Sequence, residues 1–413
     1  MAASARSSIF LALALARNAG KETRTMRIFR SFSTSSSLTC EPEVVSFHQE
    51  SDNDEKGSGE NDDLKSRILR LRLPKRSATN VIHRWVSEGN KVSISDLRQI
   101  SKHLRQSHRF KHALEISEWM VSHDEFELSD SDYAVRIDLM TKIFGIDAAE
   151  RYFEGLPPSA KTSETYTALL HSYAASKFTE KAEDLFDRIK ESNLSLSALT
   201  YNELMTLYMS VGQLEKIPII VEEMKRQKVA PDLFTYNLLV SSSAAGLNID
   251  EASRILDEMS LQSCFNESWL RYVNLVKVYI SAGHLVNSDF GSVVESEKGI
   301  TQREWITYDF LIILYGGLGN KDKLDQIWKS LILTKQKMIG RNYACILSSY
   351  LALGHLKEVR EIIDQWKQST TTDFDSSICN RLLKAFVEVG LTERAATLHL
   401  LLTEKGCDSL IEL

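Results

Sequence analysis

Few side chains in this chain of 413 residues have the types and spacing that catalysis or metal binding requires. Its ten histidines are scattered. His108 and His112 are four residues apart, but a turn is expected at His108, which favours core or surface roles over metal binding. Five cysteines show no CxxC spacing and an odd total. Reduced, mostly buried thiols therefore fit the sequence better than a zinc site or a disulfide framework.

Motifs of enzyme chemistry are also missing from the sequence. We find no glycine-rich phosphate loop, no serine elbow and no HxE motif combined with CxxC. The sequence therefore predicts a protein without enzymatic activity, with no catalytic residue, no cofactor and no metal.

A basic segment offers a different chemistry, the attraction of phosphate. Residues 64–112 contain thirteen basic and two acidic residues, and we expect Arg98, Arg105 and Arg109 to contact phosphate. The alternatives are a solvated surface on capping helices or remaining targeting character. Residues 113–413 carry a net charge of minus fourteen, which argues against indiscriminate nucleic-acid binding along the whole chain.

A helical hairpin is predicted where the chain reads TYNELMTLYMSVGQLEKIPIIVEEMKRQKVAPD, residues 200–232. Two runs of apolar residues recur here at three- and four-residue spacing, as in two amphipathic helices. Gly212 separates the runs and can take the left-handed conformation that ends a helix. Pro218 falls in the first turn of the second helix, where its missing N–H costs little.

This hairpin recurs with a period of 35 residues. The pairs Thr165-Tyr166, Thr200-Tyr201 and Thr235-Tyr236 keep that spacing, and so do Tyr308 with Tyr343 and Gly319 with Gly354. Small residues recur in the second helices, where two helices must approach closely: Ala113, Ala149, Ala182 and Ala252. A fixed period of this length is typical of a solenoid of stacked hairpins.

The repeated residues resemble a known family. The TYN opening at Thr200, the glycine at Gly212, the EEM ending at Met224 and the closing VAPD resemble the pentatricopeptide repeat of organellar RNA-binding proteins. The Trp/Leu-Gly/Tyr pattern of the tetratricopeptide repeat is missing. Residues 84–120 resemble the opening of a short plant mitochondrial subgroup, and the chain fits the P-class of the family. Eight or nine units are counted, with starts near Ile94, Asp130, Ser163, Ala198, Leu233, Ser268, Trp305, Gly340 and Asp375.

This resemblance implies an RNA-binding groove. In the family the first helix of each unit lines the concave face, and one base is read per unit by two or three side chains. Asn202 and Asp232 match the family's reader pair, which prefers uracil, and we expect both to be exposed. Leu199 and Phe234 would clamp the base between them, and stacking of this kind is worth about 1–3 kcal/mol.

The other units depart from the family's pattern. Thr167 with Ser197 keeps two small hydrogen-bonding groups and is expected to favour a purine, whereas Asn237 is paired with the longer Glu267. Elsewhere one or both polar readers are missing: Ala134 with Thr162, Asp309 with Ile339, Ala344 with Phe374, and the positions of Tyr272 and Cys379. The alternative is that these positions are exposed helix residues of a protein-binding scaffold.

The front of the chain has the composition of an import peptide. Residues 1–39 carry six basic residues, one acid and many serines and alanines, which favours organelle import over secretion despite the apolar run at residues 9–16. RSFST at residues 30–34 resembles plant matrix-processing sites and favours mitochondria over chloroplasts. Residues 41–63 contain nine acids and one lysine and are expected to be disordered. No apolar run is long enough for a membrane span.

The expected organisation has four parts. They are a mitochondrial transit peptide at 1–32, a disordered acidic linker at 33–63, basic N-terminal capping helices at 64–93 and a pentatricopeptide solenoid at 94–413. The fold class is all-α, a right-handed superhelix of about eight to nine tandem 35-residue helix-turn-helix repeats. The chain ends soon after the last repeat, so we expect no appended deaminase-like or nuclease domain.

Two functions follow from this organisation. One is a non-catalytic protein of the mitochondrial matrix that binds single-stranded mitochondrial RNA and acts in RNA processing, stability or translation. The other is an architectural subunit of the mitochondrial ribosome or of another protein assembly.

Overall fold

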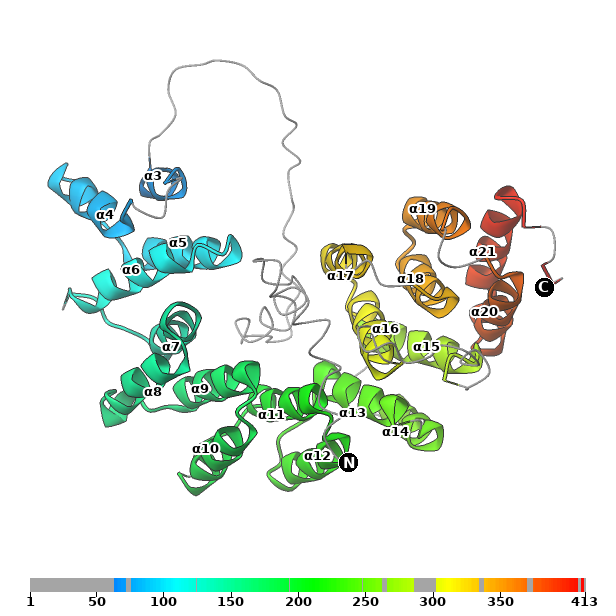
Figure 1. The fold of residues 1–413 in the computed structure, drawn as a ribbon, viewed down its shortest axis with the longest axis horizontal. Helices are drawn as coiled ribbons and strands as arrows, with labels where there is room; N and C mark the ends of the chain where they lie inside the picture. The colour runs from blue at the N-terminus through cyan, green and yellow to red at the C-terminus, as the bar shows by residue number, and fades with distance from the viewer. Residues whose placement is uncertain are drawn as a thin grey trace, which may run out of the picture. The chain divides into compact units, whose positions relative to one another are not determined.

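The computed structural model describes residues 63–411 apart from 72–75, 124, 193, 247, 262–265, 286–301, 334–337, 370–373 and 408–409. Within these residues the chain forms helices and two short 3₁₀ turns and no strand (Figure 1). They divide into two compact units, residues 63–204 and 205–411. The expected transit peptide, and the acidic linker except for Asp63, lie outside the described residues.

The first unit opens with two short helices in the segment expected to cap the array, α3 (Leu64–Leu69) and α4 (Ala78–Ser87). They share a hydrophobic core with the first hairpin, in which Ile68, Ile82 and Leu97 are fully buried. Three hairpins follow: α5 (Ile94–Gln106) with α6 (Phe110–Val121), α7 (Asp130–Phe144) with α8 (Ile146–Glu154), and α9 (Ser163–Ser176) with α10 (Thr179–Glu191). A 3₁₀ turn, η1 (Pro158–Ala160), precedes α9.

The boundary between the units falls inside α11 (Ala198–Val211), which is followed by the 3₁₀ turn η2 (Leu214–Lys216) and by α12 (Ile217–Arg226). The remaining hairpins are α13 (Leu233–Ala245) with α14 (Ile249–Leu261), α16 (Gln302–Gly317) with α17 (Lys321–Leu333), α18 (Gly340–Ala352) with α19 (Leu356–Lys367), and α20 (Ser376–Glu388) with α21 (Thr392–Glu404). A helix begins within three residues of every predicted start, which confirms the hairpin repeat and the all-α solenoid class.

The turns have the predicted chemistry. Gly212 has a φ of 78° and Gly354 a φ of 76°, so each ends its first helix in the left-handed region that glycine occupies without strain. Pro218 lies in the first turn of α12, as predicted. His108, where a turn was expected, has a φ of 59° between α5 and α6.

Packing between hairpins follows the repeated residues. The four small residues predicted at close helix contacts are all fully buried: Ala113, Ala149, Ala182 and Ala252. The tyrosine of the first helix stacks edge-on against an aromatic ring of the preceding second helix, as in Tyr166 with Phe153, whose ring centroids are 4.9 Å apart, and Tyr343 with Trp328 at 5.5 Å. Aromatic pairs of this geometry stabilise beyond the area that they bury. Each hairpin therefore completes the core of its neighbour.

One helix departs from the expected order. α15 (Glu267–Ser281) begins one residue before the predicted start at Ser268, but α13 packs broadly on α16 and meets α15 through Asn237 with Tyr272 and Tyr236 with Trp269. α15 packs on α14, α16, α18 and α20, and Nε1 of Trp269 donates to the carbonyl oxygen of Met259 on α14 at 3.1 Å. Most of its circumference is buried, and Tyr272 and Val276 are fully so. The second helix expected for this unit falls at residues 286–301, outside the described residues.

Candidate nucleic-acid interface

The predicted base readers lie at one equivalent position of successive first helices. Thr167, Asn202 and Asn237 are each the fifth residue of their helix, α9, α11 and α13. All three are buried, at 7, 3 and 3% exposure. The expectation that Asn202 is exposed is therefore wrong. Its neighbours Thr200 and Glu203 are bonded to Thr167 and His171 of α9, so this stretch of α11 is packed on α9. Asp232 is exposed, as expected.

Thr167 has a structural contact that accounts for its polarity. Its hydroxyl donates to the carbonyl oxygen of Ser163 at 2.7 Å, one turn back in α9. It also lies 2.9 Å from the hydroxyl of Thr200, on α11. A threonine at this position therefore joins two neighbouring first helices, whether or not it also meets a base.

Asp232 has a second role, as the N-cap of α13. Its Oδ1 atom accepts from the backbone N–H of Thr235 at 2.7 Å, and the backbone N–H of Asp232 donates to the hydroxyl oxygen of Thr235 at 3.2 Å. Such a cap satisfies N–H groups that would otherwise have no intrahelical partner. A substitution here that cannot cap will change helix stability as well as any base contact.

The remaining predicted reader and clamp residues are accessible in part. Ser197, just before α11, is exposed, and Leu199 and Phe234 are half-buried. Asn202 and Leu199 belong to the first unit, whereas Asp232 and Phe234 belong to the second. The pairing of Asn202 with Asp232, and the clamp of Leu199 with Phe234, stay predictions.

Asn237 is hydrogen-bonded to another helix of the same chain. The phenol of Tyr272, on α15, donates to the amide oxygen of Asn237 at 3.2 Å, and both residues are buried. Burial raises the pKa of Tyr272 well above its ordinary value, so the phenol keeps its proton. This bond uses an edge of the amide that a base would need.

The arginines of the basic segment have intramolecular partners. Arg98, on α5, holds the carboxylate of Asp132 through Nη2 at 2.6 Å and Nε at 3.1 Å. Burial of Asp132 acts in the opposite direction, but the bonds from Arg98 and Ser129 lower the pKa of this carboxyl. The Asp132 bond also raises the pKa of Arg98. Part of this guanidinium stays open to solvent, with the side chain 41% exposed.

Arg109 is bonded to backbone atoms of the same chain. Arg109 donates to the carbonyl oxygens of Leu69 and Leu71 at 2.8 Å and of Ile68 at 3.1 Å, where α3 ends. Arg105 is half-buried, and burial lowers its pKa. Phosphate contact by these residues stays a prediction. The hydrogen bonds of Arg109 hold the end of α3 in place.

A charged cluster that the sequence analysis missed crosses the first helices of the first unit. Nδ1 of His171 on α9 lies 2.9 Å from Oε2 of Glu203 on α11, and Asp138 of α7 pairs with Lys142. Burial opposes protonation of His171, but Glu203 and Asp138 outweigh it and raise the pKa of His171. The only trace of this cluster in the sequence is an ionisable residue in each successive first helix, at a similar distance from the start of the helix.

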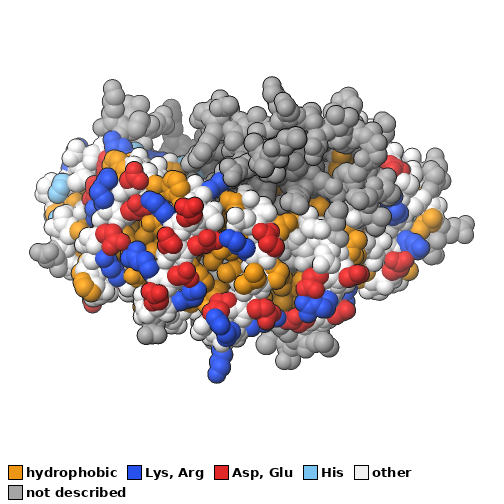
Figure 2. Space-filling model, turned by 60° about the horizontal axis from the view of Figure 1, so that its bottom comes forward, with side chains coloured by type: hydrophobic (Ala, Val, Ile, Leu, Met, Phe, Trp, Pro, Cys, Tyr) orange, Lys and Arg blue, Asp and Glu red, His pale blue; other side chains and the backbone are white. Residues whose placement is uncertain are grey.

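Charge on the face shown in Figure 2 is mixed and not basic. On the face shown in Figure 2, acidic and basic side chains alternate, with apolar side chains between them. Exposed ion pairs between neighbouring second helices, such as Lys181 with Glu150 and Lys225 with Glu258, contribute to this pattern. The observation agrees with the net negative charge of residues 113–413.

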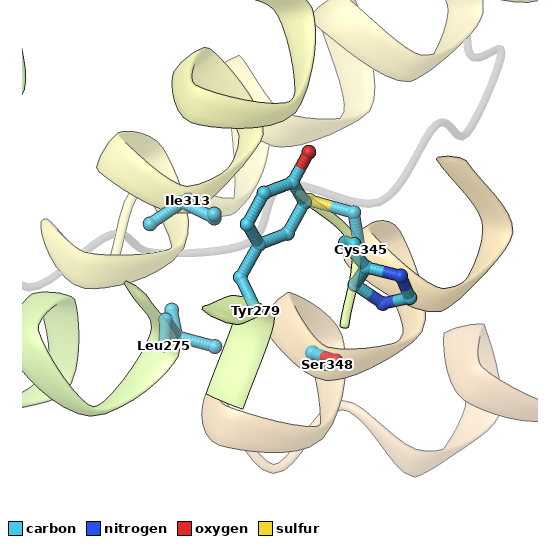
Figure 3. Close-up of a pocket in the computed structure, with 6 residues that line it drawn as sticks. Leu275, Tyr279, Ile313, Cys345 and Ser348 are labelled. Atoms are coloured by element: carbon cyan, nitrogen blue, oxygen red, sulfur yellow. The ribbon is translucent and has the colours of Figure 1, made fainter. Parts of the chain in front are cut away.

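A small pocket lies where α15, α16 and α18 meet (Figure 3). It is lined by Leu275, Tyr279, His284, Ile313, Cys345 and Ser348. Both ring nitrogens of His284 are buried without a hydrogen-bond partner among the described residues, and burial next to Arg341 and Arg381 lowers the pKa of His284 to about 3. The imidazole is therefore neutral and packs as a core residue.

A polar network borders this pocket. Asp309 is fully buried and accepts from Tyr279 Oη at 2.8 Å, from Asn342 Nδ2 at 2.9 Å and from Arg341 Nε at 2.8 Å. Asp309 follows the Thr307-Tyr308 pair, as Asn202 and Asn237 follow theirs. A second reader position is thus filled from within the chain.

Other chemistry finds little support in the described part of the chain. No group of histidines, cysteines and carboxylates there could hold a metal ion, and His112 instead donates from Nε2 to the carbonyl oxygen of Arg76 at 2.9 Å. Cys345, Cys379 and Cys407 are buried free thiols, as predicted, whereas Cys40 and Cys264 lie outside it. None of its helices combines the length and apolar character that crossing a membrane requires.

Comparison with known proteins gives matches that agree with the repeat. The pentatricopeptide repeat domain model matches residues 191–246 and 220–264, and the PPR repeat model matches residues 164–194. "Pentatricopeptide repeat-containing protein At5g09450, mitochondrial" from Arabidopsis thaliana is 60% identical over 351 residues, 85% of this chain and 86% of that protein. "Pentatricopeptide repeat-containing protein At2g20710, mitochondrial" from the same plant is 30% identical, over 83% of this chain and 70% of that protein.

Among solved structures, the chain is similar to the pentatricopeptide repeat protein PPR10 in complex with an 18-nt psaJ RNA element. The TM-score is 0.42 at 16% identity, over 83% of this chain and 49% of that chain. This chain therefore spans about half the length of that protein.

Proposed function

The chain belongs to the pentatricopeptide repeat family, and from that premise we propose that it is a mitochondrial protein that binds single-stranded RNA without catalysing a reaction. Its role would be in the processing, stability or translation of organellar RNA, in the matrix. Relatives named as mitochondrial and the basic, serine-rich start of the chain support this location.

One observation carries the proposal. The polar residues Thr167, Asn202 and Asn237 stand at the same place in three successive first helices, directly after the buried tyrosine of each. A polar position repeated once per hairpin, beside apolar or aromatic neighbours such as Leu199 and Phe234, is the arrangement by which helical repeats read one base each. We place the best-matched reader pair at Asn202 and Asp232, with uracil as its preferred base.

A second function is favoured by a different observation. Two reader positions, Asn237 and Asp309, are bonded to tyrosines of α15, and Thr167 is bonded to Thr200. A protein with few accessible readers could serve as an architectural subunit of the mitochondrial ribosome or of another assembly, gripping RNA backbone or protein without reading bases.

Two measurements separate these functions. For the first, the tagged protein would be crosslinked to RNA in isolated mitochondria, and the bound RNA sequenced. A short defined RNA whose binding to the purified protein weakens with salt supports base-reading. For the second, native extracts would be sedimented after salt washing, and stable co-migration with a ribosomal subunit would replace the first proposal.

A further inference from the structure

α15 packs on the side of α16 that the other described helices leave open. α16 is flanked by α13 and α18 and backed by its own second helix α17, so the side left is the one on which α15 packs. The same helix packs on α18 and α20, and Figure 1 shows it next to α16 and α20. In a helical repeat array this open side of the first helices is where a strand-like ligand lies.

Its tyrosines bond to the positions that would read bases. Tyr272 and Tyr279 are seven residues apart, which places them on one face of α15. Tyr272 donates to Oδ1 of Asn237 at 3.2 Å, and Tyr279 donates to Oδ2 of Asp309 at 2.8 Å. Both acceptors follow a Thr-Tyr pair in their first helix, so α15 fills the same position in two hairpins.

Close backbone packing fixes α15 at this site. A Cβ atom on Gly317 would lie 2.6 Å from Cβ of Tyr272, whereas one on Gly316 would lie 2.9 Å from Cβ of Ser349 on α18 and 3.1 Å from Cδ1 of Leu275. Arg271 adds a bond from Nη1 to the carbonyl oxygen of Gly317 at 2.9 Å. Two consecutive glycines at the end of α16 are unfavourable for the helix by themselves, and the close approach of α15 to Gly317 and of α18 to Gly316 accounts for them.

Apolar contacts complete the site. Leu275 and Val276 lie between the two tyrosines, at 3 and 0% exposure, and Leu275 meets Ile313 and Cys345 around the small pocket (Figure 3). Removal of α15 would expose this apolar face and leave Asn237 and Asp309 without their phenol donors. RNA would have to replace all of these contacts in order to enter.

We propose that α15 acts as an internal ligand that excludes RNA from the hairpins begun by α13, α16, α18 and α20. This inference deepens the proposed function and rests on it: the protein reads RNA with its earlier repeats, and its footprint is shorter than its number of hairpins. Tyr272 and Tyr279 are positioning residues of α15, not RNA contacts.

Hydrogen exchange of the wild-type protein tests the proposal without any substitution. Amides of α15 should exchange slowly, and addition of a saturating oligouridylate should leave the exchange of α15, α16 and α18 unchanged. Fast exchange of α15 in the free protein, or faster exchange of α15 when RNA binds, would overturn the proposal, because α15 would then be undocked or displaced.

A matched pair of glycine substitutions tests the exclusion itself. Gly317→Ala forces a Cβ against Tyr272, whereas Gly246→Ala, at the end of α13, meets only ordinary contacts at 3.4 Å or more. A ladder of fluorescein-labelled oligouridylates would run from a few bases to beyond one base per hairpin. Wild type and Gly246→Ala should stop gaining affinity at a short length. Gly317→Ala should bind the longest oligomer about tenfold or more tightly than wild type does, the gain of one further stacked base.

The outcomes separate this inference from the proposed function. Equal plateaus in all three proteins, with α15 shown to be released by faster exchange in Gly317→Ala, would refute exclusion while RNA binding stands. If Gly317→Ala does not release α15 or does not fold, Tyr272→Phe with Tyr279→Phe removes both bonds without added volume, and the same comparison applies. Absence of RNA binding by every form would remove the proposed function, and exclusion with it, although slow exchange would still show α15 docked.

Discussion

His171 on α9 and Glu203 on α11 are 32 residues apart in the chain, and yet Nδ1 of the histidine lies 2.9 Å from Oε2 of the glutamate. Both side chains are nearly buried, at 12 and 10% exposure. The pair joins two first helices by a charge-assisted hydrogen bond wherever the histidine is protonated.

The first prediction concerns the pH dependence of stability. Because Glu203 and Asp138 raise the folded-state pKa of His171, the pair stabilises fully below the unfolded pKa of about 6.5 and loses this effect as pH rises through the folded value. Glu203→Gln should therefore lower the free energy of unfolding by about 1–2 kcal/mol near pH 6 and by less near pH 9. Urea unfolding at both pH values measures the difference.

The control for this prediction is Glu191→Gln, an exposed glutamate at the end of α10. It should change stability little, and equally at the two pH values. An equal loss at both pH values in Glu203→Gln would show that the bond does not depend on the charge of His171.

The second prediction tests phosphate contact by Arg98. Arg98→Gln removes the positive charge and the ion pair, whereas Asp132→Asn removes the ion pair and keeps the positive charge of Arg98. Since this arginine is partly exposed, each change should cost only about 0.5–1 kcal/mol of stability. If Arg98 meets phosphate, its loss alone should reduce the slope of log affinity against log salt concentration by about one. Equal slopes in the two variants would restrict Arg98 to its bond with Asp132.

The third prediction concerns Arg109, which binds three backbone carbonyls at the end of α3. Arg109→Lys keeps the charge but loses the planar fork, so it should release α3 and cost about 1–3 kcal/mol. Hydrogen exchange should then speed up in residues 64–71 and stay slow in α9. Lys111→Arg, an exposed basic change two residues away, provides the comparison. Unchanged exchange in α3 would contradict the assigned role.

The fourth prediction separates capping from base reading at Asp232. Asparagine caps a helix as well as aspartate does, so Asp232→Asn should preserve stability, whereas Asp232→Ala should cost about 1 kcal/mol. Both should lower the preference for oligouridylate over oligocytidylate, by about tenfold if a charged hydrogen bond is lost. Fluorescence anisotropy gives the two affinities. Full preference in Asp232→Asn would leave the carboxylate with a capping role alone.

The fifth prediction concerns the start of α18. A Cβ on Gly340 would lie 2.2 Å from Cδ1 of Ile378 on α20, so Gly340→Ala should overpack this contact and cost about 1–3 kcal/mol. Ile378→Val removes the clashing methyl group and should recover part of the loss in the double variant. Thermal unfolding of the two single variants and the double variant measures the coupling. Strictly additive losses would mean that the two residues do not meet.

Much of the fold could be predicted because the residues that repeat every 35 positions have simple physical roles. Gly212 ends a helix, Ala149 and Ala182 allow close approach, and each repeated tyrosine fills the core between hairpins. These are local requirements that recur with the period, so the spacing alone places the helix starts.

The site was harder to predict, because its outcome depends on contacts that the period does not encode. Asn202 has the residue type expected of a reader and yet is buried, and Arg109 looks like a phosphate ligand but caps α3. The sequence of α15 departs from the register at Tyr272, which stands where a polar reader is expected, but this residue did not reveal that α15 packs on α16, α18 and α20. Packing between segments far apart in the sequence determines the burial of Asn202, the bonds of Arg109 and the position of α15.

The clamp on α3 has a consequence for the order of folding. Leu69 precedes Arg109 by 40 residues, so a chain that emerges or is threaded from its N-terminal end presents α3 well before the guanidinium that holds it. A six-residue helix is too short to persist in water unaided. The first helix of the described residues is therefore among the later ones to settle, and it acquires its place only when the hairpin behind it has closed.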